Sequence, residues 1–135
     1  MLEQRIFHIK SNQDFKNIAL EVFQYQFQHV STYRTYCELL HIQPHEVNTM
    51  EDIPFLPIEF FKKLTVISSE KKPATTFTSS GTTGSISSKH LVADLNLYRK
   101  SFLDGFQNFY GDPSELVILA LLPSYLEREG SSLVY

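Results

Sequence analysis

A charge-free, Ser/Thr-rich segment with two glycines three residues apart constrains this 135-residue chain more than any other feature. Residues 73–88 carry no charged side chain, and ten of the fourteen residues from Thr75 to Ser88 are Ser or Thr. The β-prone stretch Thr75–Thr78 is followed by glycine-punctuated residues that are typical of a loop. Glycines at this spacing, Gly81 and Gly84, let the backbone turn tightly and let a ligand approach the main chain. The segment therefore predicts a strand that leads into a loop.

This loop has the donors that a phosphate group needs. Consecutive backbone N–H groups can form an anion-binding nest, and the hydroxyl groups of Ser79, Ser80, Thr82, Thr83 and Ser85 add further donors. Lys89 adds a positive charge. Each charge-assisted hydrogen bond to a phosphate oxygen contributes about 1.5–3 kcal/mol. The alternative is a flexible surface linker of the same composition. Phosphate binding is favoured over it because a β-prone stretch precedes the loop and a helix is expected after it.

Three better-known loops do not fit this segment, although Gly81 and Gly84 do match the GxxG spacing of KH domains. A Walker A loop needs four residues between its glycines and an adjacent Lys-Ser/Thr, whereas Gly81 and Gly84 enclose two residues and no lysine follows directly. The GxxG loop of KH domains tracks a nucleic-acid backbone, and this chain has no basic residue between Lys72 and Lys89. A G-x-S-x-G nucleophile elbow is absent, so a serine hydrolase or amidase is a distant third reading.

The residues before the loop predict mainly helix. Apolar residues recur every three or four positions across residues 11–41, and Ser11 or Asn12 can cap the start. A longer gap at 29–32 predicts that two helices meet there. A proline-punctuated connector over 48–57 then leads to a short expected helix, 58–63, and a strand, 64–67.

The residues after the loop predict a helix and a strand. Asp94 can cap a helix whose apolar side chains extend to Phe109, and a turn is expected at 111–113. The wholly apolar run Leu116–Leu122 is typical of a strand that is buried on both faces, as in a parallel or mixed sheet. The fold class expected is therefore α/β, in one domain of residues 1–135 with a helical lead-in, 1–50, and an α/β part, 51–135.

Composition narrows the class of protein. The single cysteine, Cys37, excludes an internal disulfide and indicates a reducing compartment. The longest apolar run is far shorter than the ~20 residues that a membrane span needs, and no signal peptide is visible after Met1. The net charge of −3 gives no general attraction for nucleic acid or acidic lipid. A cytoplasmic globular chain is expected.

Several blocks of sequence resemble one enzyme family. Thr78–Gly84 closely resembles the Ser/Thr/Gly nucleotide loop of the adenylate-forming enzymes, the superfamily of acyl-CoA synthetases and firefly-type luciferases. Within it, the longer resemblance is to the acyl-protein synthetases of the LuxE type, the long-chain-fatty-acid luciferin-component ligases. It extends from about Pro54 to the end, while the first helices resemble the family only loosely. The further blocks that carry it are Leu56–Lys62, Ser88–His90, Leu121–Arg128 and Ser131–Tyr135.

This resemblance implies a two-step ligase. ATP and a fatty acid, or another carboxylic acid, form an acyl-adenylate and release pyrophosphate, and the acyl group then passes to a cysteine thiol or another acceptor. By motif match, Ser79, Ser80, Gly81, Thr82, Thr83 and Gly84 bind the β- and γ-phosphates. The Mg-binding acid and the acyl-accepting cysteine of the family belong to later parts of such chains, so no catalytic residue is expected in this portion. An acyltransferase or reductase is the protein partner that the resemblance suggests.

Five further residues have two interpretations each. In the superfamily the loop lysine follows a proline and lies nearer the second glycine, so Lys89 is either a phosphate ligand or a surface residue. His90 is a candidate substrate-binding residue, and it is expected to form hydrogen bonds or to pack, since activation of a carboxylate needs no general base. Ser124 and Tyr125 would border the acyl pocket by resemblance, or would belong to an exposed turn. Cys37 is expected in the core, not with His41 in a metal site.

The isolated chain is expected to bind ATP weakly and to turn over nothing. Leu133–Tyr135 resembles the beginning of an interrupted element, so a longer ligase is the leading hypothesis. The alternative is a non-catalytic fragment or interaction module that keeps the first section of the fold.

Overall fold

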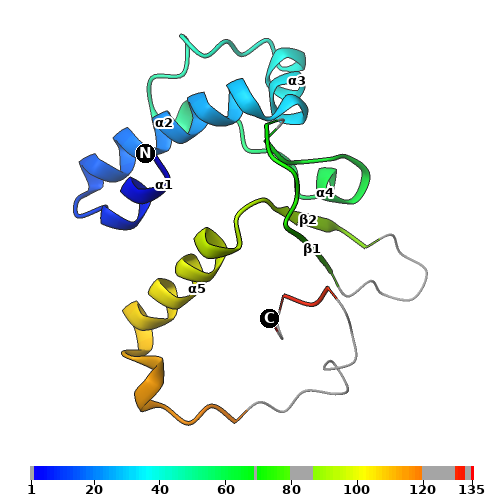
Figure 1. Cartoon of the computed structure of the whole chain (residues 1–135). Coiled ribbons are helices and arrows are strands. Elements are labelled where there is room, and N and C mark those ends of the chain that lie inside the picture. Colours follow the sequence, from blue (N-terminus) through cyan, green and yellow to red (C-terminus); the bar gives the residue numbers. More distant parts are fainter. Residues whose placement is uncertain (1, 69, 80–86, 120–129, 133–134) are drawn as a thin grey trace. The chain divides into compact units, whose positions relative to one another are not determined.

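The computed structural model describes residues 2–68, 70–79, 87–119, 130–132 and 135. Figure 1 draws the chain, which divides into two compact units, Met1–Lys72 and Pro73–Tyr135. Among the described residues, no helix is both long enough and apolar enough to cross a membrane.

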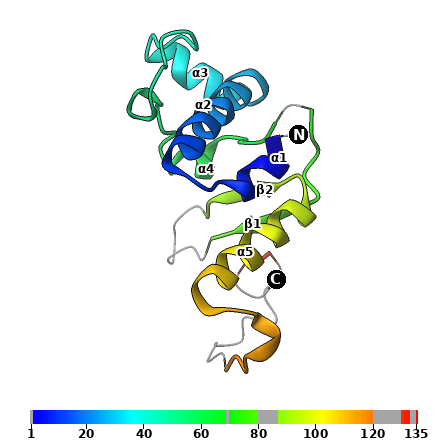
Figure 2. The same ribbon diagram turned by 90° about the vertical axis from the view of Figure 1, so that its left-hand side faces the viewer.

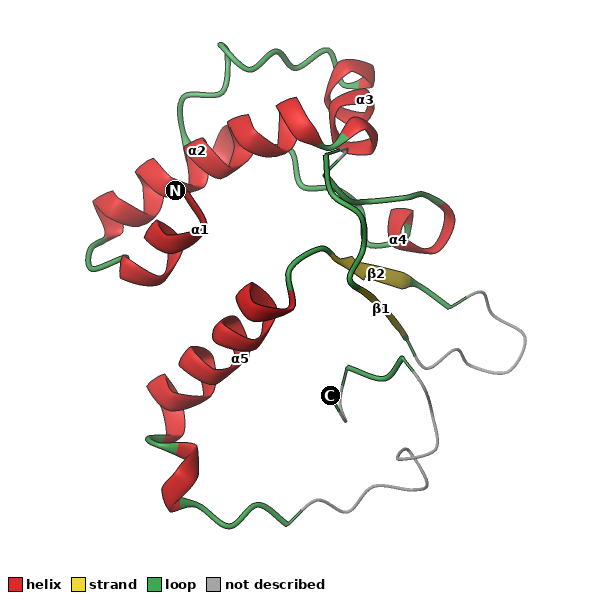
Figure 3. Cartoon of the chain, viewed as in Figure 1, coloured by secondary structure: helices red, strands yellow, loops and turns green. Residues whose placement is uncertain are grey.

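The first unit is helical (Figure 3). Two helices occupy the expected stretch 11–41, and the junction at Val30 lies in the predicted gap, where φ −110° and ψ 99° interrupt the helix. Ser11 is the N-cap, because its hydroxyl oxygen accepts a hydrogen bond from the Asp14 amide at 3.1 Å. The elements are α1 (Leu2–Arg5), η1 (Ile6–His8), α2 (Asn12–His29), α3 (Ser31–Leu39), η2 (Met50–Asp52) and α4 (Phe60–Lys63).

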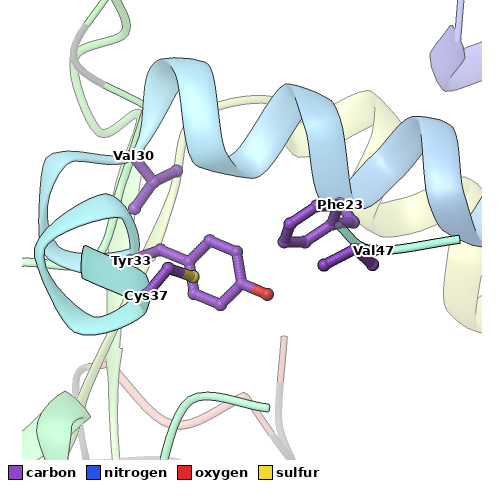
Figure 4. Close-up of a cluster of buried hydrophobic side chains, with 5 residues drawn as sticks. All are labelled: Phe23, Val30, Tyr33, Cys37 and Val47. Carbon is purple, nitrogen blue, oxygen red and sulfur yellow. The ribbon is translucent and has the colours of Figure 1, made fainter. Parts of the chain in front are cut away.

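The core of this unit gathers around the α2–α3 junction. Figure 4 shows its five buried side chains, Phe23, Val30, Tyr33, Cys37 and Val47. The rings of Phe23 and Tyr33 meet edge to face, with centroids 6.1 Å apart. The Tyr33 hydroxyl donates to the Pro54 carbonyl at 2.7 Å, which ties the connector to the helices. The prediction that Cys37 belongs to the core is confirmed, since none of its surface is exposed.

The second unit holds the loop of interest. Strands β1 (Thr75–Thr78) and β2 (Lys89–Val92) pair antiparallel, with Thr75 opposite Val92 and Thr78 opposite Lys89 (Figure 2). Helix α5 (Leu95–Tyr110) follows, and η3 (Pro113–Glu115) comes after it. The predicted cap is confirmed, because the Asp94 carboxylate accepts hydrogen bonds from the amides of Asn96 and Leu97 at 2.8 and 3.1 Å.

The expected parallel or mixed sheet is wrong for the described part of the chain. The sheet found there is two-stranded and antiparallel, and the connection of ten residues between β1 and β2, 79–88, is shorter than the dozen or more residues that a crossover between parallel strands requires. Helices and a small sheet do combine, so the broad α/β class fits.

Two predicted strands are also wrong. Residues 64–67 form no strand: the Thr65 carbonyl accepts from the Thr32 hydroxyl at 2.6 Å, and Val66 packs on the helical core. Leu116–Leu119, predicted as a buried strand, has no regular structure, and Leu119 is 92% exposed. Residues 120–122 of that prediction lie outside the described residues. The expected helix over 58–63 begins at Phe60.

Candidate functional site

The Ser/Thr/Gly loop, residues 79–88, joins the two strands as the connection of a β-hairpin. Its first and last residues are bound to each other twice. The Ser79 amide donates to the Ser88 carbonyl at 3.1 Å, and the Ser88 amide donates to the Ser79 hydroxyl oxygen at 3.0 Å. These bonds continue the strand pairing by one position, so the two ends of the loop are held together.

The predicted phosphate-binding residues divide into two groups. Ser79 lies at the base of the loop, where its hydroxyl oxygen serves the hairpin closure. The other loop residues, Ser80, Gly81, Thr82, Thr83 and Gly84, lie outside the described residues. Ser124 and Tyr125, predicted at the acyl pocket, lie outside them as well.

The side chains of Lys89 and His90 leave the hairpin on opposite faces. Successive side chains of a strand point to opposite faces of a sheet, and residues paired across strands share a face. Lys89 is paired with Thr78, and His90 with Phe77. Both side chains are exposed, but they leave β2 on opposite faces. A phosphate group held over one face is therefore within direct reach of only one of the two.

The face that carries His90 is packed beside it with aromatic rings. Phe77 is only 5% exposed, and its ring centroid lies 5.1 Å from that of Tyr98 and 5.4 Å from that of Tyr135. Lys89 lies on the other face, with Thr76, Thr78 and Leu91. The face of Lys89 is thus the one on which a ligand does not compete with the Phe77 cluster.

Three residues that contribute to this site were not predicted from the sequence. Ser88 closes the loop, Gly130 accepts a hydrogen bond from the Thr78 amide at 2.8 Å, and Tyr135 packs on Phe77. A sequence signal existed only for Gly130, since a glycine between charged and polar residues is typical of a turn. Nothing local to Ser88 or Tyr135 indicates which strand they contact.

A separate depression of about 430 Å³ lies in the first unit, between α1, η1 and α2. Its lining residues are polar except for Ile18, and one of them, Arg5, pairs with Glu21 through two hydrogen bonds of 2.5 and 2.8 Å. The bond from Arg5 lowers the pKa of the Glu21 carboxyl group. Because the positive charge of Arg5 is already paired with Glu21, Arg5 does not make the depression a binding site for an anion. The lining residues are Gln4, Arg5, His8, Asp14, Asn17 and Ile18.

Within the described part of the chain, no three His, Cys, Asp or Glu side chains gather where they could hold a metal ion. Cys37 and His41 were not expected to form such a site. Burial raises the pKa of the Cys37 thiol, which disfavours the thiolate form that binds metals.

Comparison with known families gives one match. A family model described as "Acyl-protein synthetase, LuxE" matches residues 5–107, about three quarters of the chain. The match includes helices α2 to α4 and both strands of the hairpin and ends within α5, whereas residues 108–135 lie outside it. A search of curated proteins found no match, and neither did a search of solved structures.

Proposed function

Because the chain belongs to the LuxE family of acyl-protein synthetases, we propose that it supplies the nucleotide loop of an ATP-dependent acyl-activating ligase. The observation that carries the proposal is the family match over residues 5–107, which includes the Ser/Thr/Gly loop. The closed base of this loop supports it, since a phosphate-binding loop must present its donors from a fixed frame.

The proposed reaction has two steps. A carboxylate oxygen of a fatty acid, or of another carboxylic acid, attacks the α-phosphorus of ATP, the Pα–O–Pβ bond breaks, and pyrophosphate leaves with the electron pair. A thiolate or another nucleophile then attacks the acyl carbonyl carbon, and AMP leaves. Charge accumulates on the departing pyrophosphate in the first step, so donors placed around the β- and γ-phosphates lower its barrier.

In this proposal the backbone and hydroxyl groups of Ser79–Gly84 bind the β- and γ-phosphates. Lys89 adds a cation at the base of the loop, and its position opposite Thr78, one pair from the Ser79–Ser88 closure, supports this role. His90 has no direct part in phosphate binding, since it leaves β2 on the other face. Ser124 and Tyr125 border the acyl group.

The other components of the reaction are assigned to residues beyond this chain. The Mg²⁺ that accompanies ATP is best held by clustered carboxylates and is assigned to an acidic residue elsewhere in the enzyme. The described residues do not fit such a site, so no step is assigned to the ion here. The acyl acceptor and an acyltransferase or reductase partner are likewise assigned outside the chain.

The test measures pyrophosphate release from ATP and a fatty acid by a longer protein that contains this chain. Substituting Gly81→Ala or Thr82→Val should reduce the rate at least about tenfold, since one charge-assisted hydrogen bond is worth more than 1.4 kcal/mol. Gly105→Ala is the matched control, because a side chain at Gly105 would meet no atom within 4 Å. Unchanged release in the loop variants would overturn the assignment. The 135-residue chain alone should bind ATP weakly and release no pyrophosphate.

A second candidate is an interaction module that keeps this section of the fold without catalysis. Exposed apolar side chains in the second unit favour it, because surfaces of this kind often mark contact with another chain. ATP binding separates the two proposals, since a pure interaction module has no need of nucleotide. The exposed residues are Phe102, Leu103, Phe109, Tyr110, Leu116, Val117, Ile118, Leu119 and, at 47% exposed, Tyr135.

A further inference from the structure

Strand β1 is hydrogen-bonded along both of its edges. Successive backbone amides of a strand point to opposite edges. The Ser79 amide donates toward β2, to the Ser88 carbonyl, while the Thr78 amide donates the other way, to the Gly130 carbonyl at 2.8 Å. Gly130, which lies 42 positions beyond the end of the loop, thus occupies the outer edge of the strand from which the loop departs.

Both the backbone conformation and the limited space at position 130 favour glycine over a residue with a side chain. Its φ of +79° lies in the left-handed region, which side chains disfavour. A Cβ atom at this position would also lie 3.3 Å from the Thr76 carbonyl oxygen and 3.5 Å from Thr78 Oγ1. Both neighbours belong to β1, so a substitution that crowds Gly130 pushes directly on the strand.

The same strand is held on one face by Tyr135. The Tyr135 ring contacts Phe77 of β1 and, with centroids 6.0 Å apart, Tyr98 of α5. Arg99 lies over the Tyr135 ring, with Cζ 5.8 Å from its centroid, and donates to the Tyr135 hydroxyl at 3.4 Å. Tyr135 therefore links β1 to α5 on the face opposite to that of Lys89.

We infer that Gly130 and Tyr135 are positioning residues for the nucleotide loop, Gly130 at the edge of β1 and Tyr135 on its face. The inference rests on the proposed function, because it assigns these residues an effect on ATP affinity. By holding β1 in place, these two residues also hold Ser79, the first residue of the loop. The hydrogen bonds between Ser79 and Ser88 then hold the last residue of the loop. The residues act through the strand and do not touch the nucleotide themselves.

The inference predicts that weakening either contact lowers the fraction of chains whose loop is ready to bind. Apparent affinity falls in proportion to that fraction. Only the β- and γ-phosphates are assigned to the loop, so ATP affinity should fall while AMP affinity does not. A merely structural defect would lower the affinity for both nucleotides, together with the melting temperature.

The experiment measures ATP and AMP dissociation constants by calorimetry for the 135-residue chain and four variants. Gly130→Ala and Tyr135→Ala should weaken ATP binding by about fivefold or more and AMP binding by less than about twofold. Tyr135→Phe keeps the ring and should bind ATP as the wild type does. Gly105→Ala is the glycine control. Should Gly130→Ala fail to fold, the two Tyr135 variants decide the question.

Amide hydrogen exchange provides the second readout. The Thr78 amide should exchange faster in Gly130→Ala, while the Ser79 amide, bound to Ser88, is the internal reference. If the wild type binds ATP and both alanine variants bind it equally well, the inference is overturned and the proposed function stands. Equal losses of ATP and AMP binding would also overturn it. If the wild type binds no ATP, the proposed function fails, and the inference fails with it.

Discussion

The hydroxyl oxygen of Ser79 accepts a hydrogen bond from the Ser88 amide at 3.0 Å, so one side chain of the Ser/Thr/Gly loop closes the loop to which it belongs. The reciprocal bond, from the Ser79 amide to the Ser88 carbonyl, uses backbone atoms alone. The two bonds can therefore be separated by substitution. Together the two bonds define the geometry at the base of the hairpin.

Ser79→Ala removes the side-chain bond and keeps the backbone bond. A single hydrogen bond contributes about 1 kcal/mol net, which corresponds to roughly fivefold in an equilibrium constant. We expect ATP affinity to fall by up to about that factor, measured by calorimetric titration. Ser101→Ala, an exposed serine of α5, is the matched control. Full ATP affinity in Ser79→Ala would show that the closure does not matter for binding.

Lys89 and His90 should respond differently to substitution, because they leave β2 on opposite faces. Lys89→Gln removes the charge-assisted contact to phosphate that the proposed function assigns to Lys89, and it should weaken ATP binding about tenfold. His90→Gln should leave it unchanged. Titrations of both variants at two salt concentrations check the prediction, since loss of a charge also reduces the salt dependence. Equal effects of the two substitutions would contradict the assignment of Lys89.

Cys37 should be inert in the folded chain. It is fully buried, and burial raises the pKa of its thiol, so the reactive thiolate is disfavoured. A thiol reagent should modify Cys37 slowly in buffer at neutral pH and rapidly in urea. Rapid modification in buffer would contradict the core position.

Replacing this sulfur with a hydroxyl should destabilise the helical unit. Cys37→Ser buries a polar group beside Phe23 and Tyr33, so we expect the free energy of unfolding to fall by about 1–3 kcal/mol. Urea denaturation measures the change. Cys37→Ala, which adds no polar group, separates the cost of the hydroxyl from the loss of the sulfur.

Asp52 should make the stability of the first unit depend on pH. The Thr49 hydroxyl donates to its carboxylate at 2.8 Å and the Thr49 amide at 2.9 Å, and these bonds lower the pKa of Asp52. A lowered pKa in the folded state stabilises the fold above the unfolded pKa of about 3.9, and this contribution disappears as the pH falls through the folded pKa. Acid should therefore weaken the capping box.

The measurement compares urea midpoints of the wild type and Asp52→Asn at pH 7 and at pH 2.5. The wild type should be the more stable at pH 7, and the difference should narrow at pH 2.5. Glu51→Gln is the control, since Glu51 lies beside Asp52 but outside the capping box. A difference that stays constant with pH would contradict the role of the carboxylate.

Apart from the core position of Cys37, the structural predictions that were confirmed concern near neighbours in the chain. Ser11 and Asp94 cap α2 and α5 through amides two or three residues away, and β1 lies where the Thr-rich stretch predicted it. A helix cap can be predicted from the local sequence, because its hydrogen-bond donor and acceptor lie in the same turn. The junction at Val30 was visible for the same reason, as a gap in a local repeat.

The predictions that were wrong concern strands. Residues 64–67 and Leu116–Leu119 have the composition of strands, yet a strand exists only where another segment accepts its hydrogen bonds. Val66 packs on the helical core instead of joining a sheet, and Leu116–Leu119 is exposed. The expected parallel or mixed sheet was wrong for the described residues for the same reason, since composition does not specify which strand pairs with which.

The sequence by itself determined the helix caps, the core position of Cys37, the Ser/Thr/Gly loop and the family to which the chain belongs. Only the tertiary structure decided that Ser88 closes the loop, that Lys89 and His90 lie on opposite faces, and that Gly130 and Tyr135 contact β1. The physical reason is sequence separation. Propensity and capping act within a few residues, whereas the pairing partner of a strand is chosen among segments that only folding brings together.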